Sequence, residues 1–373
     1  MSVPFLDLKA PYRELAEDLD AASRRVFESG WYLLGKECEA FEAEFAQYCG
    51  GRHCVSVGTG LDAIELIIRA LDIGPGDEVI VPSNTYIASW LGVTAAGATP
   101  IPVEPDPSTF NIDPDRIEAA ITPRTKAILV VHLYGRPVDL DAVDAVASRH
   151  GLPIVEDAAQ AHGARYRGAR IGSRLAAAFS FYPGKNLGAF GDGGAVVTND
   201  SAIADKVRLL RNYGSKIKYH NDIKGTNSRL DELQAAMLRV KLSHLDTWNG
   251  RRAAVAERYL TELAGLDGLV LPTVQPDTEH AWHLFVLRAE QRTQLQEKLT
   301  AAGIGTLIHY PIPPHRSPAY ADAELPAGSL PIAERLAEEV LSLPIGPHVT
   351  QEQVTEVVTA VRTAVADLGG LAA

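Results

Sequence analysis

Three short segments of the sequence contain residue types that can do chemistry together. The first, Gly58-Thr59-Gly60-Leu61-Asp62-Ala63, lies between an expected strand and an expected helix. Such a turn offers free backbone N–H groups and the positive end of a helix dipole to a phosphate. It also matches the dinucleotide pattern G-x-G-x-x-A, but that pattern needs an acid at the end of the next strand, which instead reads Val81-Pro82-Ser83. A phosphate-binding turn and a tight turn that merely requires glycine both remain open.

The second and third segments supply a carboxylate and an amine. Val155-Glu156-Asp157 is an apolar strand that ends in acid, at the place where ligands bind to parallel α/β sheets, although an Asp there can also be only a helix cap. Lys185 follows the strand-like run Phe179-Ser180-Phe181-Tyr182 and precedes a glycine-rich stretch at 188–194. Most lysines are solvated surface charges, but glycines beside this one would let the backbone approach a ligand closely.

These three features together match the needs of pyridoxal phosphate. That cofactor requires a lysine for its Schiff base, a carboxylate on its ring nitrogen and a binding cup for its phosphate. The chain supplies them in the order phosphate turn, Asp157, Lys185. The sequence therefore predicts pyridoxal phosphate as the cofactor and Lys185 as the group that moves a proton during the reaction.

An α/β domain is expected to position these groups. Between residues 52 and 200, short β-rich runs alternate with helical stretches such as Leu61–Leu71 and Leu140–Arg149, which predicts a three-layer α/β/α domain. The run 127–131 is apolar on both faces, as in a parallel strand that helices cover on each side. The expected strands are His53–Val57, Glu78–Pro82, Thr99–Val103, Lys126–His132, Leu152–Glu156, Ala177–Tyr182 and Ala195–Thr198.

The C-terminal third is expected to form a smaller α+β domain. A helix is predicted from Ser228, where Ser228-Arg229-Leu230-Asp231 resembles a capping box, to Leu263. The predicted domains are 1–245 and 246–373. The later strands are expected at Trp282–Leu287 and Gly305–His309, and the later helices at Arg292–Ala302, Ile332–Leu341 and Gln351–Ala366.

Composition excludes several classes of protein. Apolar residues make up 46% of the 373 residues and the net charge is −12, so the chain is a poor candidate for binding nucleic acid or an anionic membrane. No secretory signal and no membrane-spanning apolar run is recognised, which predicts a cytoplasmic protein. Cys38, Cys49 and Cys54 lack a metal-binding spacing. His280 and His283 form only an isolated His-x-x-His pair, so no metal site is predicted.

At this point the sequence resembles a known family, the DegT/DnrJ/StrS sugar-nucleotide aminotransferases, which have the type I aminotransferase fold. The resemblance extends from Pro4-Phe5-Leu6-Asp7-Leu8 through Ser29-Gly30-Trp31-Tyr32 to Leu343-Pro344, nearly the whole chain. Related dehydratases have His where Lys185 stands, so lysine favours amino transfer. The resemblance implies a homodimer that moves an amino group from L-glutamate to a nucleotide-linked keto-sugar.

The resemblance also assigns roles to individual residues. Lys185 would form the Schiff base, Asp157 would pair with the ring nitrogen, and Gln160 would hydrogen-bond the hydroxyl side of the ring. Tyr86 would stack on the ring face. The phosphate would be held by Thr59, Gly60, the backbone of Leu61, and Ser180. Asn227, which alone would be interpreted as a helix N-cap, would reach the cofactor phosphate of the neighbouring subunit.

The substrate side is expected in three places. Tyr182 in Tyr182-Pro183-Gly184-Lys185 resembles the subgroup that aminates C3 of a dTDP-3-oxo-6-deoxyhexose, whereas C4-aminating relatives usually have His there. His309 and Tyr310 resemble the family's sugar-contacting loop. Lys218 lies in a polar stretch that either meets the diphosphate or is a solvated surface loop.

Two alternatives stay open. One is amination at C4 of a 4-keto-sugar. The other is a non-catalytic sugar-nucleotide-binding or sensory protein that keeps the fold. The presence of both Lys185 and Asp157 opposes catalytic silence, and the absence of an added DNA-binding segment opposes a regulator.

Overall fold

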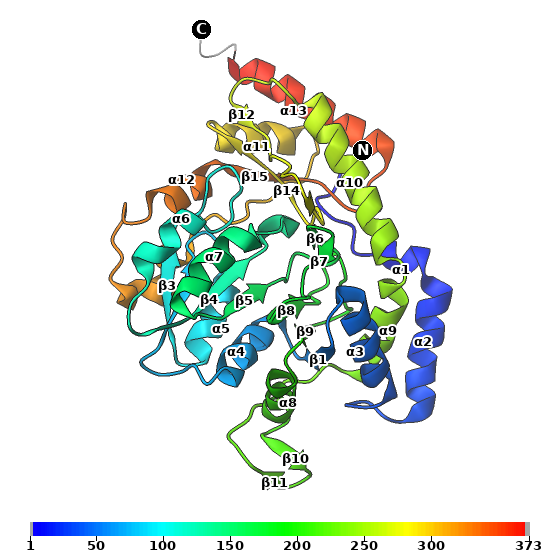
Figure 1. Cartoon of the computed structure of the whole chain (residues 1–373). Helices are drawn as coiled ribbons and strands as arrows, with labels where there is room; N and C mark the ends of the chain where they lie inside the picture. Colours follow the sequence, from blue (N-terminus) through cyan, green and yellow to red (C-terminus); the bar gives the residue numbers. More distant parts are fainter. Residues whose placement is uncertain (1–2, 370–373) are drawn as a thin grey trace.

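A central seven-stranded sheet organises the larger part of the computed structural model, which describes residues 3–369. The strand order is β1-β9-β8-β5-β4-β2-β3 (Figure 1). Strands β3, β2, β4, β5 and β8 run parallel to one another, and β9 runs antiparallel to both β8 and β1. The bounds are β1 His53–Val57, β2 Glu78–Pro82, β3 Thr99–Val103, β4 Thr125–Val131, β5 Ile154–Asp157, β8 Ala176–Ser180 and β9 Gly194–Thr198.

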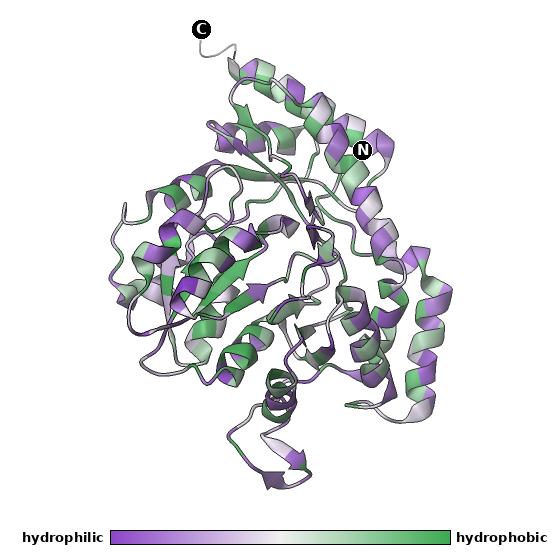
Figure 2. Ribbon diagram, viewed as in Figure 1, coloured by the Kyte–Doolittle hydropathy of each residue, from purple (hydrophilic) through white to green (hydrophobic). Residues whose placement is uncertain are grey.

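Helices cover both faces of this sheet because its strands are apolar on both faces. Ile128 and Val130 of β4 pack into one core with helices α3, α7 and α9, while Ala127 and Leu129 pack into the opposite core with α4, α5 and α8. Figure 2 shows the central strands mainly in green, the hydrophobic end of its scale. The expected three-layer α/β/α architecture is confirmed. The covering helices are α3 Lys36–Cys49, α4 Gly60–Ala70, α5 Ile87–Ala95, α7 Leu140–His150, α8 Ser201–Leu210 and α9 Glu232–Leu242.

A second, smaller core surrounds a three-stranded antiparallel sheet. Its strands are β12 Leu269–Val270, β14 Phe285–Ala289 and β15 Val340–Leu343, and its helices are α10 Leu245–Glu262, α11 Arg292–Ala301 and α13 Gln351–Gly369. Val3, near the start of the chain, packs into this C-terminal core and bonds to residues 303 and 305. Helix α10 contributes to both cores, Leu245 to the first and Val255 to the second. The division at 245/246 stays a prediction, and residues 370–373 of the predicted small domain lie outside the described residues.

The remaining elements are short or peripheral. They are α1 Ala10–Glu14, α2 Ala16–Ser29, α6 Pro114–Ile117, α12 Pro331–Glu339, β6 Arg165–Tyr166, β7 Ala169–Arg170, β13 Thr278–Glu279, β10 Ser215–Ile217 and β11 His220–Asn221. Strands β10 and β11 form a hairpin that extends from the body beyond α8 (Figure 1). None of the helices in residues 3–369 is long and apolar enough to cross a membrane.

The predicted long helix from Ser228 to Leu263 is wrong at its start and in its middle. Helix α9 begins at Glu232, and Ser243 and His244 separate it from α10. Asp231 makes no side-chain capping bond. The expected capping box does not form because Ser228 is used elsewhere: its hydroxyl accepts a hydrogen bond from the Gly58 N–H at 2.9 Å.

Two predictions in the C-terminal part are also wrong. Gly305–His309 forms no strand, only an isolated bridge between Leu307 and Ser342. The helix expected to end at Leu341 stops at Glu339, and Val340–Leu343 continues as β15. An apolar run of this length suits a helix end or a strand equally, and pairing with β14 decides for the strand.

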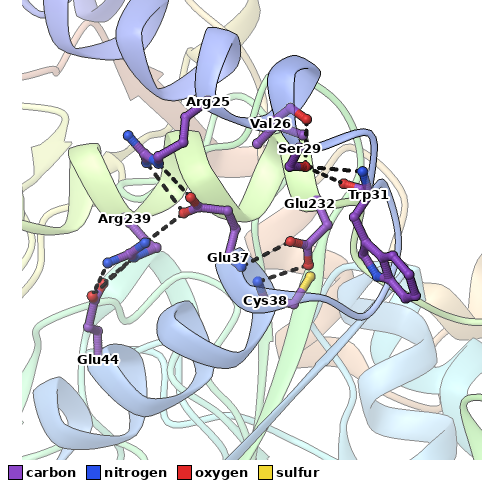
Figure 3. Close-up of polar contacts among 9 residues, drawn as sticks. All are labelled: Arg25, Val26, Ser29, Trp31, Glu37, Cys38, Glu44, Glu232 and Arg239. Carbon is purple, nitrogen blue, oxygen red and sulfur yellow. Dashed lines mark hydrogen bonds and ion pairs between the residues drawn. The ribbon is translucent and has the colours of Figure 1, made fainter.

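A polar network joins α2, α3 and α9 (Figure 3). The buried carboxylate of Glu232 accepts hydrogen bonds from the N–H groups of Gly35, Glu37 and Cys38, at 2.7, 2.9 and 3.0 Å. It thereby satisfies N–H groups at the start of α3 that have no acceptor within their own helix. Arg239 of α9 bridges Glu37 and Glu44 of α3. The network holds the segment around residue 230 against the loop at 30–35, which lies far from it in sequence.

Candidate active site

Most of the predicted site residues come from the carboxyl edge of the parallel strands. Asp157 is the last residue of β5 and Ser180 the last of β8. Tyr86 follows β2 by four residues, and Lys185 lies in the turn after β8. Neighbouring parallel strands end at the same edge, which is where open α/β sheets bind ligands.

The turn after β1 has the structure of an anion-binding site. Thr59 is the N-cap of α4, and its Oγ1 accepts a hydrogen bond from the Asp62 N–H at 3.0 Å. Gly60 and Leu61 occupy the first two helical positions, whose N–H groups have no acceptor within the helix. Within residues 3–369, neither N–H group has another hydrogen-bond acceptor. A Cβ on Gly60 would lie 2.5 Å from the Cβ of Ser180, so only glycine allows this close approach.

Asp157 is held in one orientation by two hydrogen bonds. Its Oδ2 accepts from the Ser89 hydroxyl at 2.7 Å, and its Oδ1 accepts from the Ala159 N–H at 3.1 Å. The Thr85 and Ser89 hydroxyl oxygens are 2.8 Å apart. Because Ser89 donates its proton to Asp157, Thr85 is the donor to Ser89. Asp157 is 6% exposed, so the hydroxyls of Ser89 in α5 and of Thr85 just before α5 hold a buried side chain in one orientation.

The amine of Lys185 lies close to Asp157 and to three histidines. Burial lowers the pKa of Lys185 to about 8, and the nearby Asp157 opposes part of this effect. Burial, followed by the charge of Lys185, lowers the pKa of His162 to about 3 and that of His309 to about 4. The pKa of His283 falls well below its ordinary value for the same reasons. The three imidazoles are neutral at pH 7, and an appreciable fraction of the lysine is an uncharged, nucleophilic amine.

Gln160 stands at the junction of several aromatic residues. Its Oε1 accepts a hydrogen bond from the Tyr134 N–H at 2.5 Å, and its Nε2 donates to the Tyr310 hydroxyl at 2.9 Å. The Tyr310 ring lies 5.1 Å from the Tyr86 ring, measured between centroids. The Tyr134 hydroxyl donates to the backbone carbonyl of His309. These contacts place Tyr310 among the residues predicted to surround the cofactor ring, and not only on the substrate side.

The predicted substrate residues are less closely gathered. The Tyr182 side chain is 58% exposed beside the Lys185 turn. His309 lies 2.8 Å from the Ser342 hydroxyl through Nδ1, and its ring is 5.7 Å from that of Phe5. Lys218 belongs to the exposed turn between β10 and β11, where its Nζ lies 5.1 Å from the centre of the Tyr219 ring. The structure therefore does not bring Lys218 to the other site residues of its own chain.

Asn227 lies beside the phosphate turn of its own chain. It is exposed and forms an isolated bridge with Asn212. Its neighbour Ser228 not only accepts from the Gly58 N–H but also donates to Oδ2 of Asp62 at 2.7 Å. The predicted contact of Asn227 with the cofactor phosphate of a second subunit stays a prediction.

The histidines at 280 and 283 have unrelated partners. His280 stacks on Trp282 with ring centroids 4.0 Å apart, and its Nδ1 accepts from the Trp282 N–H. His283 is 3.2 Å from Oδ1 of Asn186. No group of three or more metal-ligating side chains occurs in residues 3–369.

Three residues of the site were not found from the sequence. Ser89 lies one helical turn after Tyr86, a spacing that could have indicated a shared face. Tyr134 follows the apolar strand β4, and the carboxyl-edge argument applied to Asp157 would have included it. The sequence around Ser228 indicates only a helix cap, because the contact of Ser228 with Gly58 spans 170 residues and leaves no local pattern.

Comparisons with known proteins agree with this geometry. The family model described as the DegT/DnrJ/EryC1/StrS aminotransferase family matches residues 13–362. The chain is 63% identical to the erythromycin biosynthesis sensory transduction protein EryC1 of Saccharopolyspora erythraea, over 97% of this chain and 99% of that protein. It is also 63% identical to a dTDP-3-amino-3,4,6-trideoxy-alpha-D-glucose transaminase of Streptomyces venezuelae, over 96% of this chain and 95% of that protein.

Solved structures show the same relationship. A crystal structure of S. venezuelae DesV in complex with a ketimine intermediate is 62% identical, with a TM-score of 0.97 over 98% of both chains. The structure of NtdA from Bacillus subtilis with bound cofactor PMP is 34% identical, with a TM-score of 0.90 over 98% of this chain and 85% of that chain. The type I aminotransferase fold expected from the resemblance is confirmed. The half-buried Lys185 and the buried Asp157 at one edge of the sheet, beside the N-terminus of α4, agree with this relationship. By the match over residues 13–362 and the identity to these relatives, the chain belongs to the DegT/DnrJ/EryC1/StrS aminotransferase family.

Proposed function

We propose that the protein is a pyridoxal-phosphate-dependent aminotransferase that transfers an amino group from L-glutamate to C3 of a dTDP-linked 3-oxo-6-deoxyhexose. The observation that carries this proposal is the Lys185 amine, whose pKa of about 8 makes it a nucleophile near neutral pH, beside the buried carboxylate of Asp157. The S. venezuelae relative named for a dTDP-linked 3-amino sugar supports the substrate class and the carbon. The PMP-bound NtdA structure supports the cofactor.

The residues present fit pyridoxal phosphate. The N–H groups of Gly60 and Leu61, which have no acceptor in the helix, suit a phosphate with Thr59 and Ser180 beside them. Asp157 suits a protonated ring nitrogen, Gln160 the ring oxygen and Tyr86 the ring face. When bound, the cofactor supplies an electron sink for charge that develops at the carbon bearing the amine. Lys185 would hold the cofactor covalently and, once released by an incoming amine, carry a proton to and from that carbon.

On the substrate side, Tyr182, His309 and Tyr310 would contact the sugar, and Lys218 the diphosphate. The β10–β11 hairpin extends from the body of the molecule and carries Lys218 away from the pocket of its own chain. A homodimer in which this hairpin and Asn227 approach the partner's site accounts for both positions. The exposed aromatic side chains Trp31, Tyr32, Tyr213 and Tyr219 support such an interface. A cytoplasmic location is supported by Cys38, Cys49 and Cys54, all buried and unpaired.

A second candidate function is a non-catalytic sensor of sugar nucleotides. The name of the S. erythraea relative favours it, since that protein is called a sensory transduction protein. The presence of both Lys185 and Asp157 in one site opposes it, because a sensor needs neither a nucleophilic amine nor a fixed carboxylate. Amination at C4 remains the alternative catalytic function. Tyr182 opposes it, because C4-aminating relatives usually have His at this position.

The deciding experiment incubates the purified protein with pyridoxal phosphate, L-glutamate and a panel of 3-keto and 4-keto nucleotide sugars. We expect Schiff-base absorbance near neutral pH and a product whose new C–N bond NMR assigns to C3. A bond at C4 would correct the regiochemistry. A protein that shows neither Schiff-base absorbance nor turnover of any sugar would favour the sensor.

A further inference from the structure

Tyr310 makes its polar contact with a cofactor-side residue, although the family resemblance places it against the sugar. The Oε1 of Gln160 must face the Tyr134 backbone, because an N–H group can only donate. The Nε2 of Gln160 therefore faces Tyr310, whose hydroxyl oxygen is the acceptor at 2.9 Å. The hydroxyl and the backbone N–H together fix which way the amide points.

The surroundings make this arrangement rigid. Tyr134 has a φ of 63°, a left-handed conformation that is rare for an aromatic residue and persists only when the surroundings impose it. Its carbonyl accepts from the Leu284 N–H and that of Gly135 accepts from the Ala281 N–H, at 3.2 and 2.9 Å. The N–H that holds Gln160 is thus anchored to the segment that leads into β14. Gln160 itself is 5% exposed, so most of its side chain is enclosed by protein.

The hydrogen-bond inventory leaves one group of Gln160 free. A glutamine amide has two N–H donors, and among the described residues only one is used, by Tyr310. Burial and the charge of Asp157 raise the pKa of Tyr310 above its ordinary range, although its bond with Gln160 opposes this, so the phenol stays protonated at neutral pH. A neutral phenol can accept from Gln160 without bringing charge to the site.

We propose that Tyr310 is a positioning residue for the cofactor: it accepts one N–H of Gln160 and thereby turns the other toward the oxygen on the cofactor ring. The proposal rests on the proposed function, since it needs pyridoxal phosphate at Lys185. A donor at the ring oxygen stabilises the negative charge that this oxygen carries when the Schiff-base nitrogen has lost its proton. The contact therefore lowers the pKa of the Schiff base. Tyr310 would thus influence the protonation of the cofactor in addition to contacting the sugar.

The test is a pH titration of the absorption spectrum of the cofactor-loaded protein. Gln160→Ala should raise the Schiff-base pKa by about 0.5 to 1 unit, the size expected for one hydrogen bond. Tyr310→Phe keeps the aromatic ring and should raise the pKa in the same direction by a smaller amount. The double variant should match Gln160→Ala alone, because Tyr310 acts only through Gln160.

Tyr259→Phe is the matched control. The buried Tyr259 hydroxyl also makes one hydrogen bond, to the Pro344 carbonyl at 2.8 Å, but within the smaller core. This variant should lower the melting temperature and leave the Schiff-base pKa unchanged. Melting curves of every cofactor-free variant establish that each one folds.

Two results would overturn the proposal. One is an unchanged pKa in folded, cofactor-loaded Tyr310→Phe. The other is a double variant whose shift equals the sum of the two single shifts, which would mean that Tyr310 acts independently of Gln160. Failure of the proposed function looks different, because the wild-type protein would then form no Schiff base at all and Lys185→Ala would change nothing in the spectrum.

Discussion

Asp157, Ser180 and the turn at 58–60 stand at the ends of strands in a single sheet, whereas Lys218 stands in a hairpin that leaves the body of the molecule. On the cofactor side, Asp157 and Gln160 are buried and their side chains have defined hydrogen-bond partners. On the substrate side, Tyr182 and Lys218 are exposed, and the predicted residues come from three separate segments. A parallel sheet brings its strand ends together whatever the loops do, so a cofactor pocket can be built by the sheet alone. Recognition of a large substrate depends on loops and, under our proposal, on a second chain.

Replacing the lysine should have the largest effect on the cofactor side. Lys185→Ala should abolish Schiff-base absorbance and reduce turnover by at least about 10³-fold, since proton transfer alone contributes about 10²–10⁴. The fold should persist, because the side chain is removed from a pocket and not from a core. The spectrum, a transamination assay and a melting curve measure these three properties. Turnover at the wild-type rate would contradict the assignment.

Mixing two inactive variants tests whether the substrate side is shared between chains. Lys185→Ala lacks the amine, and Asn227→Asp places a negative charge near the phosphate. If Asn227 serves the partner's site, one site of a hybrid dimer collects both defects and the other neither. Co-refolded equal mixtures should then regain up to about a quarter of wild-type activity per site, the limit for random pairing.

Ser228, the neighbour of Asn227, contacts the phosphate turn of its own chain. The alternative to a shared site is therefore that Asn227 serves the site of its own chain. Mixtures that stay inactive, although mass spectrometry shows hybrids, would assign Asn227 to the site of its own chain. Near-wild-type activity of Asn227→Asp alone would remove the phosphate role altogether.

Loss of the buried charge should have the next largest effect. Asp157→Asn should keep some cofactor but lose about 10- to 100-fold in kcat, because a neutral amide cannot hold the ring nitrogen protonated and a hydrogen bond to a charged group is worth about 1.5–3 kcal/mol. Glu156→Gln is the matched control, since Glu156 is equally buried but bonds to His132 at 3.0 Å. Equal losses of kcat in both variants would show that activity depends on any buried acid in this strand, and not on the position of Asp157 in the pocket.

The pH dependence of cofactor capture distinguishes a buried amine from a surface one. The pKa of Lys185 is lowered to about 8, so the uncharged, reactive fraction grows as pH rises and levels off above that value. The rate at which cofactor-free protein captures pyridoxal phosphate should therefore rise about tenfold between pH 7 and 9 and then flatten. Stopped-flow absorbance measures it. A rate that still climbs beyond pH 10 would indicate an ordinary, solvated lysine.

The smallest effect is expected on the exposed substrate side. Lys218→Ala should raise the KM for the sugar nucleotide about fivefold with kcat unchanged, since an exposed charge contact is worth about 1 kcal/mol. Salt should reduce the difference from wild type. Lys126→Ala serves as the control. Lys126 is also an exposed lysine, but it lies near the amino end of β4, away from the strand edge that carries the site. An equal KM in the two variants would leave Lys218 as a surface charge.

The strands and the pocket side of the site were predictable for local reasons. Every strand expected in the central sheet exists with bounds shifted by at most two residues, because an apolar run between helices has few other stable placements. The same alternation placed Asp157 and Lys185 at one edge. The helix from Ser228 could not be predicted correctly, since Ser228 and Glu232 bond to partners that lie 170 and 194 residues away in the sequence.

The sequence by itself determined the order of elements and the chemical types in the pocket: a glycine turn, an acid at a strand end and a lysine after the next strand. Tertiary structure alone decided the solvation and the hydrogen-bond partners of these groups. It desolvated the Lys185 amine, brought Ser89 to Asp157, and placed Gln160 between Tyr134 and Tyr310. The physical reason is that burial and hydrogen-bond partners belong to the packed chain and leave no periodic pattern in the sequence, whereas strand and helix placement follows from local hydrophobic repeats.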